Sequence, residues 1–423
     1  MKRPRSKRTG PRALVACLLP AALLASCTSS VSGHGTSSDT PGSHASATHS
    51  ARSASPRTST STSTGTGTGT GTGTPGGAGL PGMPPLLNQH DVYAADRANL
   101  VSPAIATDPA YVYVPDTNSN DVYVIDQHTM KVISIFPGGH EPQHIVPAYD
   151  LKTLYVTADK PGFGSLTPID PATGKPGAQI PIDDVYNMYF TPNGQYAVVV
   201  QEYFRRLAFY DPHTWVLHDS LTIGSCEGID HLDFTADGTK MLASCEFANQ
   251  MAVIDVATHK LLQNVPLQHV SHGMPQDVKL SPDGKTFYVA DMVANGIYSI
   301  DARTFAVISF QHTGSGAHGL YISRDSKRMF VTNRDGGAIS VIDLATGKPE
   351  ATWALPGGSP DMGNISADGT VLWLSGRYNN VVYAISTVDG HLIAQIPVGS
   401  GPHGLCVWPI PGRYSLGHTG ILR

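Results

Sequence analysis

Histidine and aspartate side chains recur at the starts of short apolar segments in this chain. The ones that could carry chemistry are His144, Asp230, His231, Asp277, His318, Asp361 and His403. Imidazole nitrogens and carboxylate oxygens bind transition metals such as copper or zinc, and an imidazole beside a carboxylate can serve as a general base and acid. Because these residues are far apart in the sequence, either chemistry needs a fold that brings them together.

A repeated pattern of strands and turns runs from about residue 102 to the C-terminus. It is clearest in residues 121–136, 280–310, 322–353 and 365–398. Each unit reads as an apolar strand, a Ser-Pro-Asp-Gly-like turn, a strand, a loop, a strand, an Asp-x-x-Thr-Gly-like turn and a last strand. Alternating polarity and Gly/Asn/Asp turns indicate four antiparallel strands per unit. One such sheet cannot bury both faces, so radial packing into an all-β propeller is expected. A linear β-solenoid is the alternative, although its repeats are shorter.

Short motifs within these units resemble a known repeat family. Tyr155-Val156-Thr157, Phe330-Val331-Thr332-Asn333 and the Ile-Asp-x-x-Thr-Gly turns are similar to the YVTN family of β-propeller repeats. The resemblance covers the chain from about Asp91 to the C-terminus. It implies a single propeller but no particular function, because propellers host many activities.

Alignment on the Ser-Pro-Asp-Gly turn predicts the number of blades. The innermost strands would begin at Ser102, Gln143, Tyr186, Asp230, Gln276, His318, Asp361 and His403. We therefore expect eight blades, the eighth closed by both termini, with residues 91–95 as an outer strand; this closure would remove edge strands. Seven blades result if the segment from His403 onward replaces the strand at Ser102.

Convergence of the inner strands would create the site. Their first residues crowd together at one mouth of the channel, so the histidines and aspartates named above should meet there. His231, His318 and His403 are the expected metal ligands, with copper or zinc as the ion. The alternative is that these side chains only form hydrogen bonds with the backbone at strand starts in a polar channel.

Two Ser-Cys-Glu sequences predict a covalent link. Cys226 precedes an inner strand and Cys245 ends its hairpin partner, so an antiparallel pair would bring both thiols to the same end. In an oxidising compartment we expect a disulfide between them. A thiolate metal site with His231 is the alternative, although the spacing is not that of a zinc motif. Cys406 lies in an apolar strand, where a buried inert thiol is expected.

The N-terminal part reads as an export signal followed by a tether. A basic stretch, a short apolar run and Leu24-Ala25-Ser26-Cys27 resemble the signal and lipobox of bacterial lipoproteins. The resemblance implies cleavage before Cys27 and lipidation of its thiol. An ordinary signal peptide or an uncleaved anchor is the alternative. The domains would then be a signal peptide at 1–26, a disordered Ser/Thr/Gly-rich tether at 27–82 and the propeller at 83–423.

These features together favour a lipid-anchored protein on the outer face of a bacterial cell membrane. A net charge of −5 gives no indication of nucleic acid as a partner. We expect a monomer that touches the membrane through its lipid alone and binds an extracytoplasmic protein, polymer or small ligand. The alternative is a metal-dependent hydrolase, lyase or redox enzyme that uses the histidines and aspartates at the channel mouth.

Overall fold

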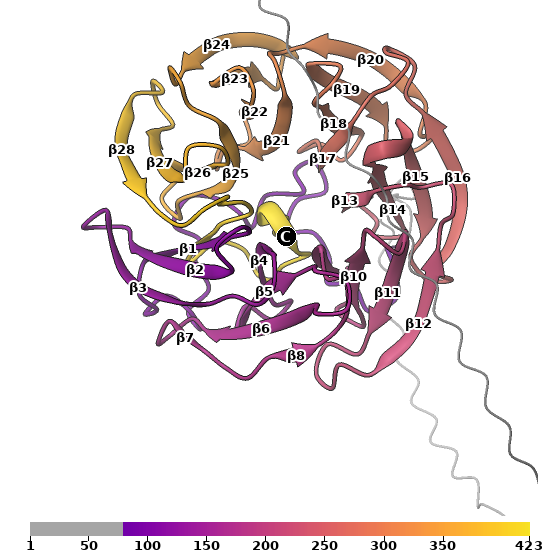
Figure 1. Cartoon of the computed structure of the whole chain (residues 1–423). Coiled ribbons are helices and arrows are strands. Elements are labelled where there is room, and N and C mark those ends of the chain that lie inside the picture. Colours follow the sequence, from indigo (N-terminus) through magenta and orange to yellow (C-terminus); the bar gives the residue numbers. More distant parts are fainter. Residues whose placement is uncertain (1–78) are drawn as a thin grey trace, which may run out of the picture. The chain divides into compact units, whose positions relative to one another are not determined.

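The computed structural model describes residues 79–423, and the strands of that part form seven antiparallel blades around a central axis (Figure 1). Six blades have four strands, and in the remaining one two short strands pair with the third strand in place of a single fourth strand. The predicted signal peptide, Cys27 and most of the predicted tether lie outside the described residues. None of the helices in the described part is long and apolar enough to cross a membrane. The chain segment 79–110 precedes the first strand and packs against the blades through contacts such as Val92 N to Pro282 O, 2.8 Å.

The first blade combines strands from both ends of the sequence. It consists of β1 (Tyr111–Asp116), β2 (Asp121–Asp126) and β3 (Lys131–Pro137), with β29 (Cys406–Trp408) as the innermost strand. β29 runs antiparallel to β1, and Cys406 lies opposite Tyr113.

The expectation of eight blades is therefore wrong. β29 takes the place beside β1 that the segment at Ser102 was expected to fill, and Val101 forms only an isolated bridge to Pro411. Residues 91–95 form turns rather than an outer strand. Two segments that both resemble an inner strand compete for one position, and the C-terminal segment occupies it.

The other six blades are each built from consecutive strands. The second blade contains β4 (Pro142–Pro147), β5 (Leu154–Ala158), β6 (Ser165–Asp170), β7 (Lys175–Pro176) and β8 (Ile180–Pro181), and the third contains β9 (Asn187–Phe190), β10 (Ala197–Gln201), β11 (Arg206–Tyr210) and β12 (Leu217–Thr222). The fourth contains β13 (Ile229–Phe234), β14 (Lys240–Cys245), β15 (Gln250–Asp255) and β16 (Lys260–Pro266), and the fifth contains β17 (Pro275–Leu280), β18 (Thr286–Asp291), β19 (Gly296–Asp301) and β20 (Val307–His312). The sixth contains β21 (Ala317–Ile322), β22 (Arg328–Asn333), β23 (Ala338–Asp343) and β24 (Lys348–Ala354), and the seventh contains β25 (Pro360–Ile365), β26 (Val371–Gly376), β27 (Val381–Ser386) and β28 (Leu392–Pro397).

Burial decreases from the axis outward. Every residue of β4, β13 and β25 is buried, whereas most residues of the outermost strands, such as β12, are exposed. Apolar side chains of the inner and middle strands fill the spaces between neighbouring blades. The turns are held by their own side chains: Asp301 accepts hydrogen bonds from the backbone and hydroxyl of Thr304.

The C-terminal segment after β29 ends at the axis of the ring (Figure 1). It pairs with an inner strand through the bridge between Gly417 and Tyr189, and it contains the short 3-10 helix η2 (His418–Gly420). The buried Arg423 side chain forms an ion pair with Asp233 at 3.2 Å. The other 3-10 helix of the described part, η1 (Glu246–Ala248), follows β14.

Candidate functional site

Histidines from four blades meet at the axis. The ring centroids lie 5.5 Å apart for His144 and His231, 6.4 Å for His231 and His318, 6.1 Å for His318 and His403, and 4.7 Å for His403 and His144. All four side chains are buried. The propeller thus brings together residues that are far apart in the sequence.

A bulge at the start of the inner strands lets two successive residues face this centre. Pairing shifts between Ile229 and Leu232, and an equivalent shift occurs in β17, β21 and β25. Asp361 Oδ1 and the Sδ atom of its neighbour Met362 consequently both lie close to His318 Nδ1, at 3.0 and 3.1 Å. Strict alternation along a strand would have placed those two side chains on opposite faces.

A fifth histidine, His418, completes the cluster. Its ring lies 4.0 Å from that of His144 and is stacked at 5.1 Å on that of His231. His418 comes from η2, beyond the last strand and outside the repeat. Alignment of the repeats cannot identify His418, because it has no equivalent position in the other blades. The only signal in the sequence is that this histidine lies in the segment after the last inner strand.

His144, His231 and His418, the axial trio, have the donor set of a metal site. One ligand atom from each lies within 4.8 Å of the others, and all three side chains are buried. Neither ring nitrogen of His144 or of His418 has a hydrogen-bond partner. Burial lowers the pKa of His144 and of His418 well below the usual value and that of His231 to about 3, so all three are neutral imidazoles at physiological pH.

His318, Asp361 and His403 form a second trio that is occupied by protein contacts. Their ligand atoms also lie within 4.8 Å of one another. However, Arg334 Nη1 lies 3.2 Å from His318 Nε2 and 3.1 Å from Asp361 Oδ1. The guanidinium supplies the positive charge that a metal ion would otherwise bring, so this trio is an internal network beside the axial trio.

Neighbouring amides orient the histidine rings. Gln143 Oε1 lies 3.1 Å from His403 Nδ1, and Gln143 Nε2 donates to Asp159 Oδ2. The Asn187 amide nitrogen lies 3.0 Å from His231 Nδ1, while its oxygen accepts the Met188 backbone N–H. Such outer contacts fix ring orientation in metal sites.

The two remaining predicted aspartates have different places. Asp230 is buried beside the axial trio, with Oδ1 3.2 Å from His231 Nε2. Asp277 instead accepts the backbone N–H groups of Val278 and Leu320, both at 2.9 Å, and so ties one inner strand to the next. The predicted ligands His231, His318 and His403 are likewise divided between the two trios.

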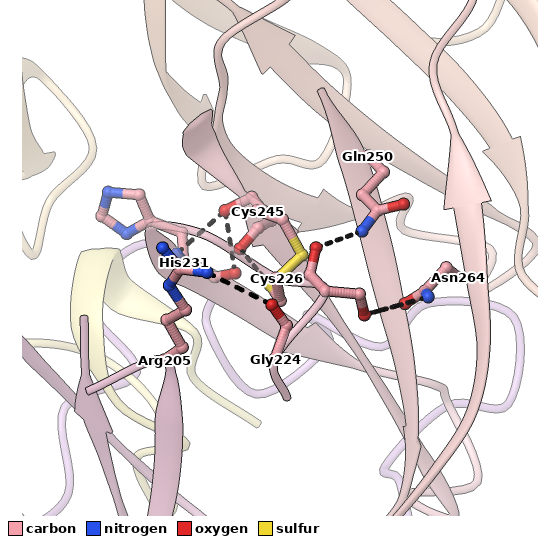
Figure 2. The surroundings of a disulfide bond; sticks show 9 residues. Arg205, Gly224, Cys226, His231, Cys245, Gln250 and Asn264 are labelled. Carbon is pink, nitrogen blue, oxygen red and sulfur yellow. Dashed lines mark hydrogen bonds between the residues drawn. A yellow bond between two sulfur atoms is a disulfide. The ribbon is translucent and has the colours of Figure 1, made fainter. Parts of the chain in front are cut away.

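A disulfide joins Cys226 to Cys245 across the start of the fourth blade (Figure 2). Cys226 lies just before β13 and Cys245 ends β14. The backbone N–H of His231 donates to the hydroxyl of Ser244, the residue before Cys245, at 3.0 Å. The disulfide therefore holds together the two strands that position His231. Cys406 is free and buried.

Comparison with known proteins identifies the architecture. A family model described as "YNCE-like beta-propeller" matches residues 274–412. A search of curated proteins finds no match to this chain.

Several solved structures share the fold. A functionally unknown protein from Desulfotomaculum acetoxidans has a TM-score of 0.58 at 15% identity, covering 70% of this chain and 99% of that one. The periplasmic gluconolactonase of Pseudomonas aeruginosa has a TM-score of 0.59 at 18% identity, covering 71% of this chain and 99% of that one. The hydrazine synthase of Kuenenia stuttgartiensis has a TM-score of 0.51 at 20% identity, covering 62% of this chain and 87% of that one. At such identities the likeness shows the fold alone: this chain is a seven-bladed β-propeller.

Proposed function

We propose that the propeller binds one transition-metal ion, zinc or copper, between His144, His231 and His418. The observation that carries this proposal is that the ring nitrogens of two fully buried histidines have no hydrogen-bond partner. Each buried polar group left unsatisfied costs about 1–3 kcal/mol. A metal ion offsets this cost, since neutral imidazoles are its ligands.

The composition of the trio limits the ion and its chemistry. Imidazole ligands suit zinc and copper, whereas calcium and magnesium prefer oxygen ligands. Three protein ligands leave a coordination position for water or substrate, as in catalytic zinc sites. A bound ion would supply Lewis-acid chemistry there. Asp230 and the second trio lie beside the axial trio, and with an ion bound they would orient a ligand and move protons.

We further propose that the protein works outside the cell, anchored by a lipid on Cys27, as an exported binding propeller with YVTN-like repeats. Support comes from the signal-like N-terminus and from the Cys226–Cys245 disulfide, because disulfides persist in oxidising compartments. The channel would then receive its metal and its ligand in the extracytoplasmic space.

Metal analysis of the full chain tests the central proposal. The protein is purified from cells grown with added zinc or added copper, and bound metal is measured by mass spectrometry. We expect about one ion per chain. His144→Gln and His418→Gln should each reduce the content at least about tenfold, since each removes one of three ligands.

A matched control separates metal loss from unfolding. His128 is exposed in the turn between β2 and β3, and His128→Gln should retain the wild-type metal content. Circular dichroism checks that every variant is folded. Metal-free wild-type protein after growth in either metal would mean that ordered water alone occupies the trio, and the proposal would fail.

A further inference from the structure

One residue beyond the second strand of each blade, a further set of side chains surrounds the channel. These seven residues, the mouth ring, are Thr117, Asp159, Glu202, Glu246, Met292, Arg334 and Arg377. Repeat geometry places them at one end of the channel, because they occupy equivalent positions in successive blades. Hydrogen bonds connect them to the inner strands: Gln143 Nε2 to Asp159 Oδ2, and Gln276 Nε2 to Glu246 Oε1, both 2.9 Å.

Charge is segregated around the mouth ring. Asp159, Glu202 and Glu246 come from three consecutive blades and form an acidic arc. Arg334 and Arg377 come from two other consecutive blades and form a basic arc. Thr117 and Met292, which are uncharged, separate the arcs. A channel lined for water alone has no reason to keep opposite charges on opposite sides.

The acidic arc is crowded and incompletely neutralised. Burial raises the pKa of Glu202 to about 9, and Glu246 and Asp159 add to the rise. Asp230 is completely buried, with Oδ1 3.2 Å from His231 Nε2. Asp159 Oδ1 is buried without a partner.

In the basic arc, the guanidinium of Arg377 is available to bind an anion. Arg377 Nη1 donates to two neutral oxygens, Thr117 Oγ1 at 2.8 Å and Gly401 O at 3.0 Å. Among the described residues, no carboxylate forms an ion pair with Arg377. Arg334 is held by Asp361, but its Nε is buried without a partner.

Hydrogen bonds link the two arcs. Arg377 Nη1 donates to Thr117 Oγ1, which lies 3.3 Å from Gln143 Oε1. Gln143 Nε2 in turn donates to Asp159 Oδ2. Tyr186 lies beside the axial trio, and its ring centroid is 6.2 Å from that of His231. The Tyr186 ring also contacts that of His144 at 5.3 Å. A ligand that spans the mouth would therefore touch both arcs.

We propose that the mouth ring binds a small dipolar molecule, with its ammonium group on Glu202, Glu246 and Asp159 and its carboxylate on Arg377 and Arg334. The ligand class is an unbranched amino acid whose two charges are separated by a short chain. The inference does not depend on the metal, because no residue of the mouth ring belongs to the axial trio.

Binding of matched probes to the full chain tests it. Glycine, 4-aminobutanoate and 6-aminohexanoate carry both charges at increasing separation, whereas hexanoate and hexylamine carry one each. By calorimetry with metal-free and metal-loaded protein, at least one dipolar probe should bind about tenfold more tightly than either single-charge probe. Binding to the metal-free protein would support the mouth ring even if the metal proposal fails.

Variants assign each end of the ligand. Arg377→Gln should weaken binding of the best dipolar probe about tenfold but leave the affinity for hexylamine unchanged. Glu246→Gln should also weaken binding of the dipolar probe about tenfold but leave the affinity for hexanoate unchanged. Arg377→Lys keeps the charge and should restore part of the affinity. Arg303→Gln, an exposed change in the turn between β19 and β20, should have no effect. Equal affinity for dipolar and single-charge probes, or no binding by any dipolar probe, would overturn the proposal.

Discussion

At the scale of single residues, Glu202 should control how stability depends on pH. Its pKa rises from 4.5 to about 9 on folding, because of burial and then of Glu246 and Asp159. The folded state thus holds this proton more tightly than the unfolded state. The free energy of unfolding contributed by this group is fully present below pH 4.5 and is lost as the pH rises through 9.

Glu202→Gln should therefore stabilise the protein at pH 8, on the order of 2–4 kcal/mol, and should flatten the pH profile above about pH 5. Urea unfolding between pH 5 and 9 measures both effects. Glu350→Gln removes an exposed carboxylate that pairs with Arg328, and should change stability by less than about 1 kcal/mol at every pH. An unchanged slope in Glu202→Gln would show that another group titrates.

Residues within the repeat could be predicted to meet, and those outside it could not. His144, His231, His318 and His403 occupy repeat positions, so the fold alone implies their convergence at the axis. His418 lies beyond the last strand, and its position depends on long-range contacts such as the Gly417–Tyr189 bridge. The positions of the mouth ring also follow from the repeat. The separation of its acidic and basic side chains becomes visible only once the order of the blades around the axis is known.

At the scale of elements, the Cys226–Cys245 disulfide should stabilise the blade that carries His231. The cysteines are 19 residues apart, and a loop of this size contributes about 3 kcal/mol in the chain-entropy model. The double variant Cys226→Ser/Cys245→Ser should lose about this amount in urea unfolding. Cys406→Ser, which removes a buried thiol outside any disulfide, is the comparison for thiol chemistry alone. If reduction leaves the wild-type midpoint unchanged, the link adds no stability.

The blade number illustrates why element-level prediction has a limit. Both Ser102 and His403 precede segments with inner-strand character, and local pattern gives no reason to choose between them. The choice depends on which segment pairs with β1. In that pairing Cys406 lies opposite Tyr113, a residue far from it in the sequence. Because sheet register depends on such non-local contacts, a count of local patterns gave one blade too many.

At the scale of the whole chain, attachment to the membrane should depend on Cys27. The lipobox-like sequence before it implies that lipid is added to its thiol. Cys27→Ala should block processing or release the propeller from the membrane fraction, as measured by fractionation and intact mass. Cys17→Ala, within the predicted signal peptide, should leave attachment unchanged. Retention of a normally processed Cys27→Ala protein in membranes would contradict the lipid anchor.

Closure of the ring should depend on β29 more than on the segment that follows it. Deleting residues 409–423 removes His418, which should abolish metal binding, and leaves the buried Asp233 without Arg423; loss of this ion pair alone should cost about 3–5 kcal/mol. Deleting residues 406–423 also removes β29, in which Val407 and Trp408 are fully buried, and exposes β1 as an edge strand. The shorter deletion should remain folded and monomeric with a lowered urea midpoint, whereas the longer one should unfold or aggregate in light scattering. Equal stability of the two truncated chains would mean that β29 does not close the propeller, because its pairing with β1 is what distinguishes them.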